Sequence, residues 1–354
     1  MIFQFHGARI HGIQLILPNH EISFDNEVNN YDFSPQQSAK LKVVMGFDRR
    51  RVVAEGVTCS DLVVAGFEAL SRDGLLDLKS LDALIVVTQT PDYPIPGTSY
   101  VIHGRLGMRQ DMLCLDINQG CAGFVVGLMT AFSLLNQAHI KRVALVNADV
   151  VSRLVAMGDR NSRPIIGDAA SITIVDATSD DSLIHGNINV DGTGWNALMV
   201  PAGGMRIRPS PQTSILKVDA NGNSRALDNL LMRGDAVFNF VMKEVPSMIQ
   251  SLLEASGMKL TQVDGFAFHQ PNPFMLRKLA EKIGVPRHKM PMDLVRNFGN
   301  SSGVSIPAVL CTSFSASYFQ QPRVMCLAGF GVGLTWGSLL MKMHELSFLN
   351  IVEI

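Results

Sequence analysis

Short apolar segments rich in β-branched residues alternate with segments of helical period through most of this 354-residue chain. Residues 81–88, 112–117 and 142–146 have the first pattern, which is typical of strands buried on both faces. Residues 60–71 and 122–136 repeat apolar side chains at helical spacing. This alternation predicts a layered α/β fold with mostly parallel strands.

The second half of the chain shows a similar alternation of predicted elements. Its helices and strands are expected at residues 234–256, 263–268, 273–283, 304–315, 323–328 and 334–341. We place the boundary between the halves in the polar, acidic segment 176–183, which gives residues 1–178 and 179–354. The two halves share no repeated sequence, but their similar pattern suits a duplicated fold.

The amino-acid composition restricts the binding partners of the protein and the cellular compartment in which we expect it. With 47% hydrophobic residues and a net charge of −1, the chain has a sizeable core and no general attraction to nucleic acid or an anionic membrane. The first 18 residues predict a strand or hairpin rather than a signal peptide, and the longest apolar stretch, residues 120–135, is shorter than a membrane span. Five cysteines without CxxC spacing indicate reduced thiols. We therefore expect a soluble cytoplasmic protein without a metal or cofactor.

A cysteine follows one of the predicted strands almost directly. Cys121 comes four residues after the apolar segment 112–117 and opens a Gly/Ala-rich apolar helix. At a helix N-terminus, unpaired N–H groups and the helix dipole favour the thiolate, which is the nucleophilic form. The placement favours covalent acyl chemistry. The alternative is a small core residue, because free cysteines are commonly buried.

Three further segments carry groups that suit the same chemistry. His269 closes an apolar strand, where catalytic groups collect in α/β folds. Asn300, in a Gly turn before a helix, either caps that helix or offers its NH₂ group to a carbonyl oxygen. The glycine-rich segment 329–333 predicts a tight turn whose backbone N–H groups face a developing oxyanion. A strand follows this turn, which excludes a dinucleotide-binding loop.

Together these segments resemble the thiolase-fold condensing enzymes, and most closely the β-ketoacyl-acyl carrier protein synthase III family. The motifs are Gly120-Cys121-Ala122-Gly123-Phe124, His269-Gln270-Pro271-Asn272, Gly299-Asn300-Ser301-Ser302 and Gly329-Phe330-Gly331-Val332-Gly333, with support from Gly167-Asp168-Ala169-Ala170 and Met232-Arg233-Gly234. The resemblance covers almost the whole chain. It implies a thiolase-like layered fold (α-β-α-β-α) of two similar halves, with the cysteine in the first and the histidine and asparagine in the second.

The resemblance also implies a mechanism. Cys121 would take an acyl group from a thioester, and the carbanion left when a malonyl thioester loses CO₂ would attack it to give a 3-oxoacyl thioester. The N–H groups of Cys121 and Val332 would hold the oxyanion, while His269 and Asn300 would hydrogen-bond the malonyl thioester carbonyl. The implied partners are acyl carrier protein or acyl-CoA thioesters, a malonyl thioester and a second copy of the chain.

Two departures from the family pattern concern the acyl donor. Lys40 and Val44 occupy the positions of the Trp and Arg that clamp coenzyme A in many relatives, which weakens the expectation of an acyl-CoA donor. Phe274 replaces a basic residue used for the carrier protein, and we expect Arg277 and Lys278, one turn further on, to substitute for it.

Other positions concern the acyl pocket. By resemblance, the loop that holds Ile95 crosses a dimer interface and caps the partner's pocket, where Ile95 replaces a bulky Phe and predicts room for medium-length or branched acyl chains. Asn272 is expected to orient its loop and Phe298 to press against the departing carboxylate. Val332 replaces a usual Gly and narrows the site. Residues 344–354 extend beyond the usual end and have no assigned role.

Three other functions are compatible with parts of the pattern. Some relatives pass the acyl group to an alcohol or amine without decarboxylation, but the intact pair of His269 and Asn300 favours condensation. Cys, His and Asn in this order also describe papain-like proteases, although an aromatic residue would then follow the cysteine. A catalytically inactive partner subunit would usually lose one of these side chains, and this chain keeps all three.

Overall fold

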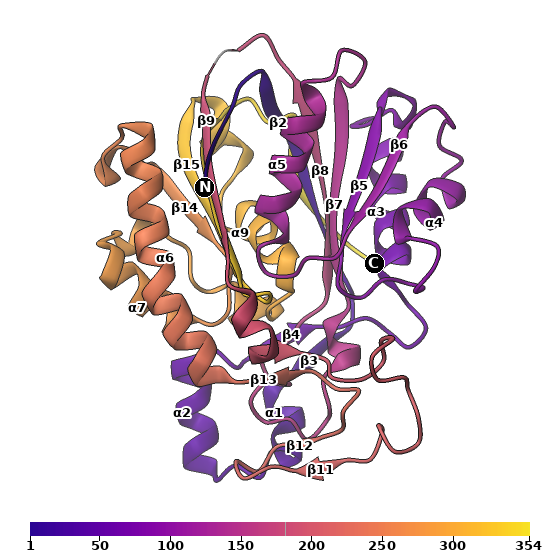
Figure 1. Cartoon of the computed structure of the whole chain (residues 1–354), viewed down its shortest axis with the longest axis vertical. Coiled ribbons are helices and arrows are strands. Elements are labelled where there is room, and N and C mark those ends of the chain that lie inside the picture. Colours follow the sequence, from indigo (N-terminus) through magenta and orange to yellow (C-terminus); the bar gives the residue numbers. More distant parts are fainter. Residues whose placement is uncertain (181) are drawn as a thin grey trace.

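The computed structural model describes residues 1–180 and 182–354, so Asp181, in the predicted boundary segment, lies outside the described residues. Two mixed sheets dominate the fold, with strand orders β17-β2-β8-β7-β5-β6 and β1-β9-β16-β15-β14 (Figure 1). The first contains β17 (Phe348–Glu353), β2 (Ala8–Leu17), β8 (Ala169–Ala177), β7 (Arg142–Asp149), β5 (Ala83–Val87) and β6 (Leu113–Ile117). The second contains β1 (Ile2–Phe5), β9 (Ile184–Val190), β16 (Thr335–Met343), β15 (Arg323–Gly331) and β14 (Gly265–Phe268).

Helices occupy the space between the sheets and both outer faces. The long helices are α3 (Cys59–Arg72), α4 (Thr98–Arg105), α5 (Gly123–Leu135), α6 (Gly234–Ser256), α7 (Pro273–Ile283) and α9 (Ser305–Ser313). Side chains of α5 and α9 share one buried core with strands of both sheets, so these helices form the middle layer. Helices α6 and α7 pack on the five-stranded sheet, and α3 and α4 pack on the six-stranded sheet. This is the predicted α-β-α-β-α layering.

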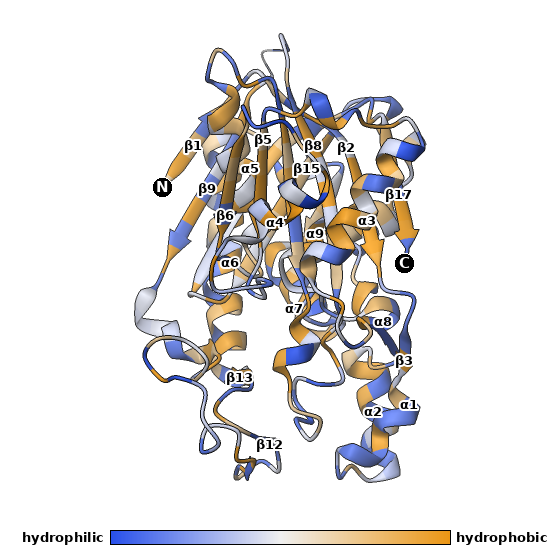
Figure 2. Cartoon of the chain, turned by 90° about the vertical axis from the view of Figure 1, so that its right-hand side faces the viewer, coloured by the Kyte–Doolittle hydropathy of each residue, from blue (hydrophilic) through white to orange (hydrophobic). Residues whose placement is uncertain are grey.

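Strand direction differs from the prediction of mostly parallel strands. The parallel pairs are β5–β6, β5–β7, β14–β15 and β17–β2, while β2–β8, β7–β8, β15–β16, β16–β9 and β1–β9 are antiparallel. The prediction was wrong because a continuous apolar run reports that both faces of a strand are buried, not which way the strand runs. Helices cover both sheets here, and the strands are largely hydrophobic whatever their direction (Figure 2).

Each end of the chain contributes a strand to the sheet of the other half. The first 18 residues were predicted to form a strand or a hairpin. They form two strands, and because β1 pairs with β9 and β2 with β8, they are not a hairpin. At the other end β17 pairs in parallel with β2, which gives residues 344–354 a structural place. A side chain at Gly12 would lie 2.5 Å from the Phe348 ring, so this glycine makes room for β17. The division after residue 178 stays a prediction.

Below the sheets, two segments form what we call the cap, residues 24–51 and 198–232 (Figure 1). Its elements are α1 (Phe24–Glu27), α2 (Pro35–Met45), β4 (Arg49–Arg51), β10 (Leu198–Met199), β11 (Lys217–Val218), β12 (Ser224–Arg225) and β13 (Leu231–Met232). The short strand β3 (Glu21–Ser23) pairs with β4, and helix α8 (Leu294–Phe298) lies beside it. Among the described residues, no helix combines the length and apolar character that crossing a membrane requires.

Candidate active site

Cys121 lies in the turn between β6 and α5, one residue before Ala122, the N-cap of that helix. The hairpin of β15 and β16 approaches this turn closely because it is rich in glycine. A side chain at Gly331 would have its Cβ 2.7 Å from the Cys121 sulfur, and one at Gly329 would lie 2.6 Å from the Ala122 Cα. The glycines therefore allow backbone groups of the hairpin to reach the sulfur.

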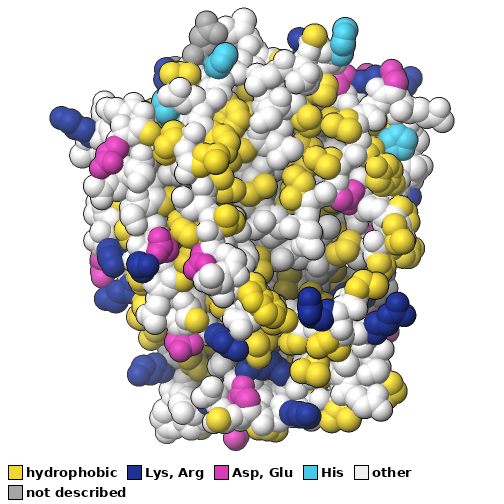
Figure 3. All heavy atoms as spheres, in the orientation of Figure 1, with side chains coloured by type: hydrophobic (Ala, Val, Ile, Leu, Met, Phe, Trp, Pro, Cys, Tyr) yellow, Lys and Arg dark blue, Asp and Glu magenta, His cyan; other side chains and the backbone are white. Residues whose placement is uncertain are grey.

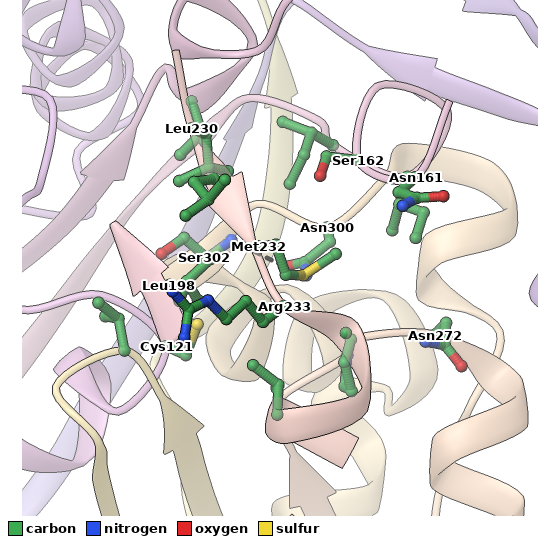
Figure 4. A pocket seen from close by; sticks show the side chains of 18 of the residues that line it. Cys121, Asn161, Ser162, Leu198, Leu230, Met232, Arg233, Asn272, Asn300 and Ser302 are labelled. Atoms are coloured by element: carbon green, nitrogen blue, oxygen red, sulfur yellow. Dashed lines mark hydrogen bonds between the residues drawn. The ribbon is translucent and has the colours of Figure 1, made fainter. Parts of the chain in front are cut away.

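The Cys121 side chain is half-buried and opens into a cavity of about 1060 Å³ between the sheets and the cap. Asn300, Ser302 and Val332 line the same cavity, and Figure 4 shows Cys121, Asn300 and Ser302 gathered at one end of it. The walls toward the cap are mainly apolar and include Phe33, Leu41, Met45, Phe47, Leu198 and Leu230. The site therefore combines a polar end beside the sulfur with an apolar passage.

The turn that holds the predicted oxyanion donor Val332 lies beside the sulfur. Val332 lines the cavity together with Cys121 and Ser302, and a Cβ at the preceding Gly331 would lie 2.7 Å from the sulfur. Val332 comes from the turn between β15 and β16, which is the tight turn that the glycine spacing predicts.

Burial of the sulfur opposes the stabilised thiolate that the position of Cys121 suggests. Burial raises the pKa of the Cys121 thiol to about 11, and the Asp149 carboxylate contributes to the rise, which outweighs the donors at Val332 and Ser302. Desolvation depends on what the folded chain packs around the sulfur, which the sequence does not show, so the stabilised thiolate stays a prediction.

The raised pKa predicts how the sulfur reacts with a small neutral reagent. Because alkylation requires the thiolate, the rate of Cys121 alkylation by iodoacetamide should rise about tenfold per pH unit from pH 7 to pH 9. The rate is measured by intact mass spectrometry with site mapping of the modified peptide. A rate that levels off below pH 8 would show that the thiol ionises normally.

His269 follows the end of β14, as predicted, and its side chain is only 3% exposed. Burial lowers the pKa of His269 to about 3, so the imidazole is neutral at physiological pH. Its Nδ1 lies 2.7 Å from the Ser305 Oγ, which lies 2.9 Å from the Ser302 carbonyl oxygen. The Ser305 hydroxyl has one proton, which it donates either to the His269 Nδ1 or to the Ser302 carbonyl. When it donates to Nδ1, the proton of the neutral imidazole is on Nε2.

Hydrogen bonds of its backbone and of one side-chain atom fix the position of Asn300. Its N–H donates to the Ile165 carbonyl oxygen at 2.7 Å, and its own carbonyl accepts from the Gly167 N–H at 3.1 Å. The side-chain Oδ1 accepts from the Ser302 N–H at 3.0 Å. With the oxygen occupied, the NH₂ group is the part of Asn300 that remains to donate to a ligand in the cavity.

Ser302 lies beside the predicted catalytic residues, although the sequence analysis assigned it no role of its own. It lines the cavity with Cys121, its N–H donates to the Asn300 Oδ1 at 3.0 Å, and its carbonyl accepts from the Ser305 hydroxyl that lies against the His269 Nδ1. The residue has a φ of 54°, in the left-handed region that side-chain-bearing residues seldom adopt. In the sequence, a serine after Asn-Ser resembles an ordinary helix N-cap. Only the fold of the backbone shows that Ser302 lies beside the predicted catalytic residues.

A second residue missed from the sequence is Asp149, at the end of β7. The side chain is 1% exposed and accepts from the Gln89 N–H at 2.8 Å and the Thr88 hydroxyl at 3.3 Å. Burial raises the pKa of Asp149 to about 6, while the hydrogen bond from the Gln89 N–H opposes that rise. The sequence signal that could have pointed to Asp149 is an acidic residue at the end of a buried strand.

Of the residues predicted to bind substrate, some line the cavity and others do not. Asn272 lines the cavity and caps α7, its Oδ1 accepting from the Met275 N–H at 2.8 Å, and Phe274 lines the cavity beside Phe238. Ile95 is 86% exposed and lies outside this chain's own cavity.

Phe298 and Arg277 do not reach the cavity. Phe298 packs against the core between the sheets, which removes its predicted contact with a departing carboxylate. Arg277 donates to the Val44 carbonyl oxygen at 2.9 Å at the end of α2, and Lys278 pairs with Glu281 at 3.3 Å. The contact of Arg277 within the chain opposes its predicted role as a substitute for a carrier contact. Lys278 is 53% exposed, and its role stays a prediction.

A cysteine beneath a glycine hairpin, within two sheets and three helical layers, is the arrangement of the thiolase-like class of enzymes. Family models agree: 3-oxoacyl-[acyl-carrier-protein] synthase III matches residues 115–192, and the C-terminal model of the same family matches residues 253–343. The chain belongs to the 3-oxoacyl-acyl carrier protein synthase III family and is an enzyme of this type. The predictions of family and fold are confirmed.

Individual relatives support this assignment over the whole chain. A protein of Campylobacter jejuni named putative 3-oxoacyl-[acyl-carrier-protein] synthase 3 is 30% identical over 353 residues, which cover 99% of this chain and 98% of the relative. A Lactococcus lactis β-ketoacyl-[acyl-carrier-protein] synthase III is 31% identical, covering 83% and 88% of the two chains. The crystal structure of a 3-oxoacyl-(acyl-carrier protein) synthase from Burkholderia xenovorans has a TM-score of 0.91 at 31% identity and covers 100% of this chain and 99% of its own.

Proposed function

We propose that this enzyme forms an acyl thioester on Cys121 and condenses it with a malonyl thioester, with loss of CO₂, to give a 3-oxoacyl thioester. The observation that carries this proposal is that Cys121, Asn300 and Ser302 line one cavity, while the buried His269 is joined to Ser302 through the Ser305 hydroxyl.

In the first step the Cys121 sulfur attacks the carbonyl carbon of the donor thioester. The carbonyl oxygen becomes an oxyanion held by the N–H groups of Cys121 and Val332. The C–S bond of the donor then breaks, and the donor leaves as a thiol with the proton that Cys121 gave up. Each preorganised N–H donor of this kind is worth about 2.7–4 kcal/mol in the transition state.

In the second step a malonyl thioester occupies the cavity. The Asn300 NH₂ and the His269 Nε2–H donate to its thioester carbonyl while the bond to the carboxylate breaks and releases CO₂. The electron pair of that bond forms the enolate, whose carbon attacks the acyl group on Cys121, and the cysteine sulfur leaves. A neutral imidazole suits this role because it donates a hydrogen bond without adding a charge.

We also propose that two copies of the chain associate through β6. This strand is at an edge of the six-stranded sheet, its Leu113 is 41% exposed, and the nearby Tyr93, Ile95 and Tyr100 are also exposed. A sheet edge with exposed apolar side chains favours pairing with a second copy. Such pairing would carry Ile95 toward the partner's cavity. Sedimentation equilibrium should give twice 38.6 kDa, and an active monomer would contradict the proposal.

The acyl donor is a thioester of coenzyme A or of acyl carrier protein, which share the pantetheine arm. Lys and Arg side chains, mixed with acidic ones, surround the lower part of the face in Figure 3, where the cap lies. A cavity with long apolar walls favours medium-length or branched acyl groups over acetyl.

Intact mass spectrometry after incubation with a panel of thioesters tests the donor. The panel contains acetyl, octanoyl and branched five-carbon groups, each on coenzyme A and on acyl carrier protein. We expect one acyl group per chain, with faster labelling by the octanoyl or branched donors. Labelling by no thioester would contradict the proposed function, whereas a preference for acetyl would contradict only the pocket size.

A further inference from the structure

One polar side chain near Cys121 has no part in the proposed mechanism. Gln89 follows the end of β5 by two residues and lines the cavity together with Cys121 and Val332. Its carboxamide forms no hydrogen bond with the part of the chain that the structure describes. The two donors and the acceptor of this group are therefore available to a ligand in the cavity.

The contacts of Gly120 show where the Gln89 carboxamide lies. A side chain at Gly120 would have its Cβ 2.1 Å from the Gln89 Oε1 and 2.7 Å from the Val332 Cγ1. The carboxamide therefore lies against the Cα of the residue that directly precedes Cys121. On the other side, a Cβ at Gly331 would lie 2.7 Å from the Cys121 sulfur. The carboxamide thus lies where an acyl group on Cys121 begins.

Hydrogen bonds of the backbone fix the segment that carries Gln89. The Gln89 N–H donates to the buried Asp149 carboxylate at 2.8 Å, and the Thr88 N–H donates to the Ile117 carbonyl oxygen at 3.1 Å. The Thr90 hydroxyl accepts from the Val150 N–H at 2.9 Å, which joins this segment to the end of β7. Directly after β7, Val151 and Leu154 line the cavity with apolar side chains. A fixed carboxamide and an apolar wall are therefore neighbours in the same cavity.

This arrangement affects which acyl groups fit. A plain hydrocarbon chain that passes the carboxamide excludes water from it and leaves its polar atoms unpaired, which is unfavourable. An oxygen on the acyl chain restores a hydrogen bond. A site that hydrogen-bonds a substrate oxygen rejects the analogue without that oxygen more strongly than an apolar pocket rejects an added hydroxyl. A hydroxyl group suits an uncharged carboxamide because both groups donate and accept.

We propose that Gln89 selects acyl groups with a hydroxyl close to the thioester carbonyl, such as 3-hydroxyacyl groups, over plain hydrocarbon acyl groups; this rests on the proposed function. Carbon 3 of an acyl group on Cys121 is three bonds from the sulfur, which suits a carboxamide beside the preceding residue. The carbons beyond it lie against Val151 and Leu154. Gln89 contacts the acyl chain and not the reacting atoms, so it determines which donor is accepted.

Single-turnover acylation by octanoyl and 3-hydroxyoctanoyl thioesters, which differ by one oxygen atom, tests the proposal. The unmodified enzyme should be acylated about tenfold faster by the 3-hydroxyoctanoyl donor. In Gln89→Met, which keeps the length of the side chain without its polar atoms, the ratio of the two rates should fall to about one, with octanoyl transfer becoming faster. Intact mass spectrometry measures both rates. A ratio that survives Gln89→Met would overturn the proposal.

Two further variants separate the carboxamide from the turn that it contacts. Gly120→Ala places a methyl group where the Gln89 carboxamide lies, so it should lower the same ratio with Gln89 intact. Gln119→Met is the matched control, because Gln119 is not among the described residues that line the cavity. It should leave the ratio unchanged. An equal fall in Gln119→Met and Gln89→Met would overturn the proposal, because it would show a general effect on the turn.

The same assay separates failure of this selection from failure of the proposed function. If the unmodified enzyme acquires no acyl group from any thioester, the proposed function is wrong. If it accepts the octanoyl and 3-hydroxyoctanoyl groups at equal rates, the proposed function stands and the role of Gln89 is overturned. If Gln89→Met lowers the mass in sedimentation equilibrium and leaves the ratio unchanged, the carboxamide serves contact between copies, which also overturns the role.

Discussion

The variant Cys121→Ala loses all detectable acyl adduct when it is incubated with the thioester that labels the unmodified enzyme best. The reason is that the sulfur supplies the only bond by which the enzyme holds the acyl group in the proposed mechanism. Intact mass spectrometry measures the adduct, and the fold of the variant is checked by its thermal unfolding.

Cys114 provides the matched control for this experiment. It lies on β6, close to Cys121 in sequence, and its thiol is half-buried with a pKa raised by burial and by Asp116. The variant Cys114→Ala should be acylated normally. An adduct that survives Cys121→Ala but disappears in Cys114→Ala would transfer the nucleophilic role to Cys114.

The second large effect concerns the two donors to the malonyl carbonyl. His269→Ala and Asn300→Ala should each reduce CO₂ release from a malonyl thioester by about 10²–10³-fold, the loss typical of one oxyanion donor. Acylation of Cys121 should stay within a few-fold of the unmodified enzyme, because this step uses the N–H groups of Cys121 and Val332. Radiolabelled CO₂ and intact mass measure the two steps separately.

A histidine outside the site serves as the control for this pair. His103 lies on α4, and its Nε2 is 2.9 Å from the Arg109 carbonyl oxygen. His103→Ala should change neither step. If His269→Ala and Asn300→Ala reduce acylation and CO₂ release equally, the division of labour between the two steps is wrong.

Local sequence signals predicted several elements with their bounds. Helix α6 begins at Gly234, where the apolar period begins, and ends before Gly257 in the left-handed conformation, while α7 begins with Pro273 after the Asn272 cap. Periodicity and capping depend on neighbouring residues in the chain, so the sequence carries them. Strand direction depends on how distant segments pair, and the prediction for it was wrong.

The same distinction holds for the site. Cys121, His269 and Asn300 were found because each follows a strand or a glycine turn, and the resemblance joined them. Ser302 was missed, because its place beside Asn300 and Cys121 arises only when the turn before α9 folds against the cavity. Burial of the Cys121 sulfur could not be predicted for the same reason, since burial is a property of the whole fold.

One pre-steady-state measurement tests the central claim most directly. Enzyme carrying an acyl group on Cys121 is mixed with a malonyl thioester labelled in its carboxylate, and samples are quenched over time. The account predicts that the acyl group leaves Cys121 and CO₂ appears with the same rate constant, one CO₂ for each acyl group, as the 3-oxoacyl thioester forms. Loss of the acyl group without release of CO₂ would contradict it.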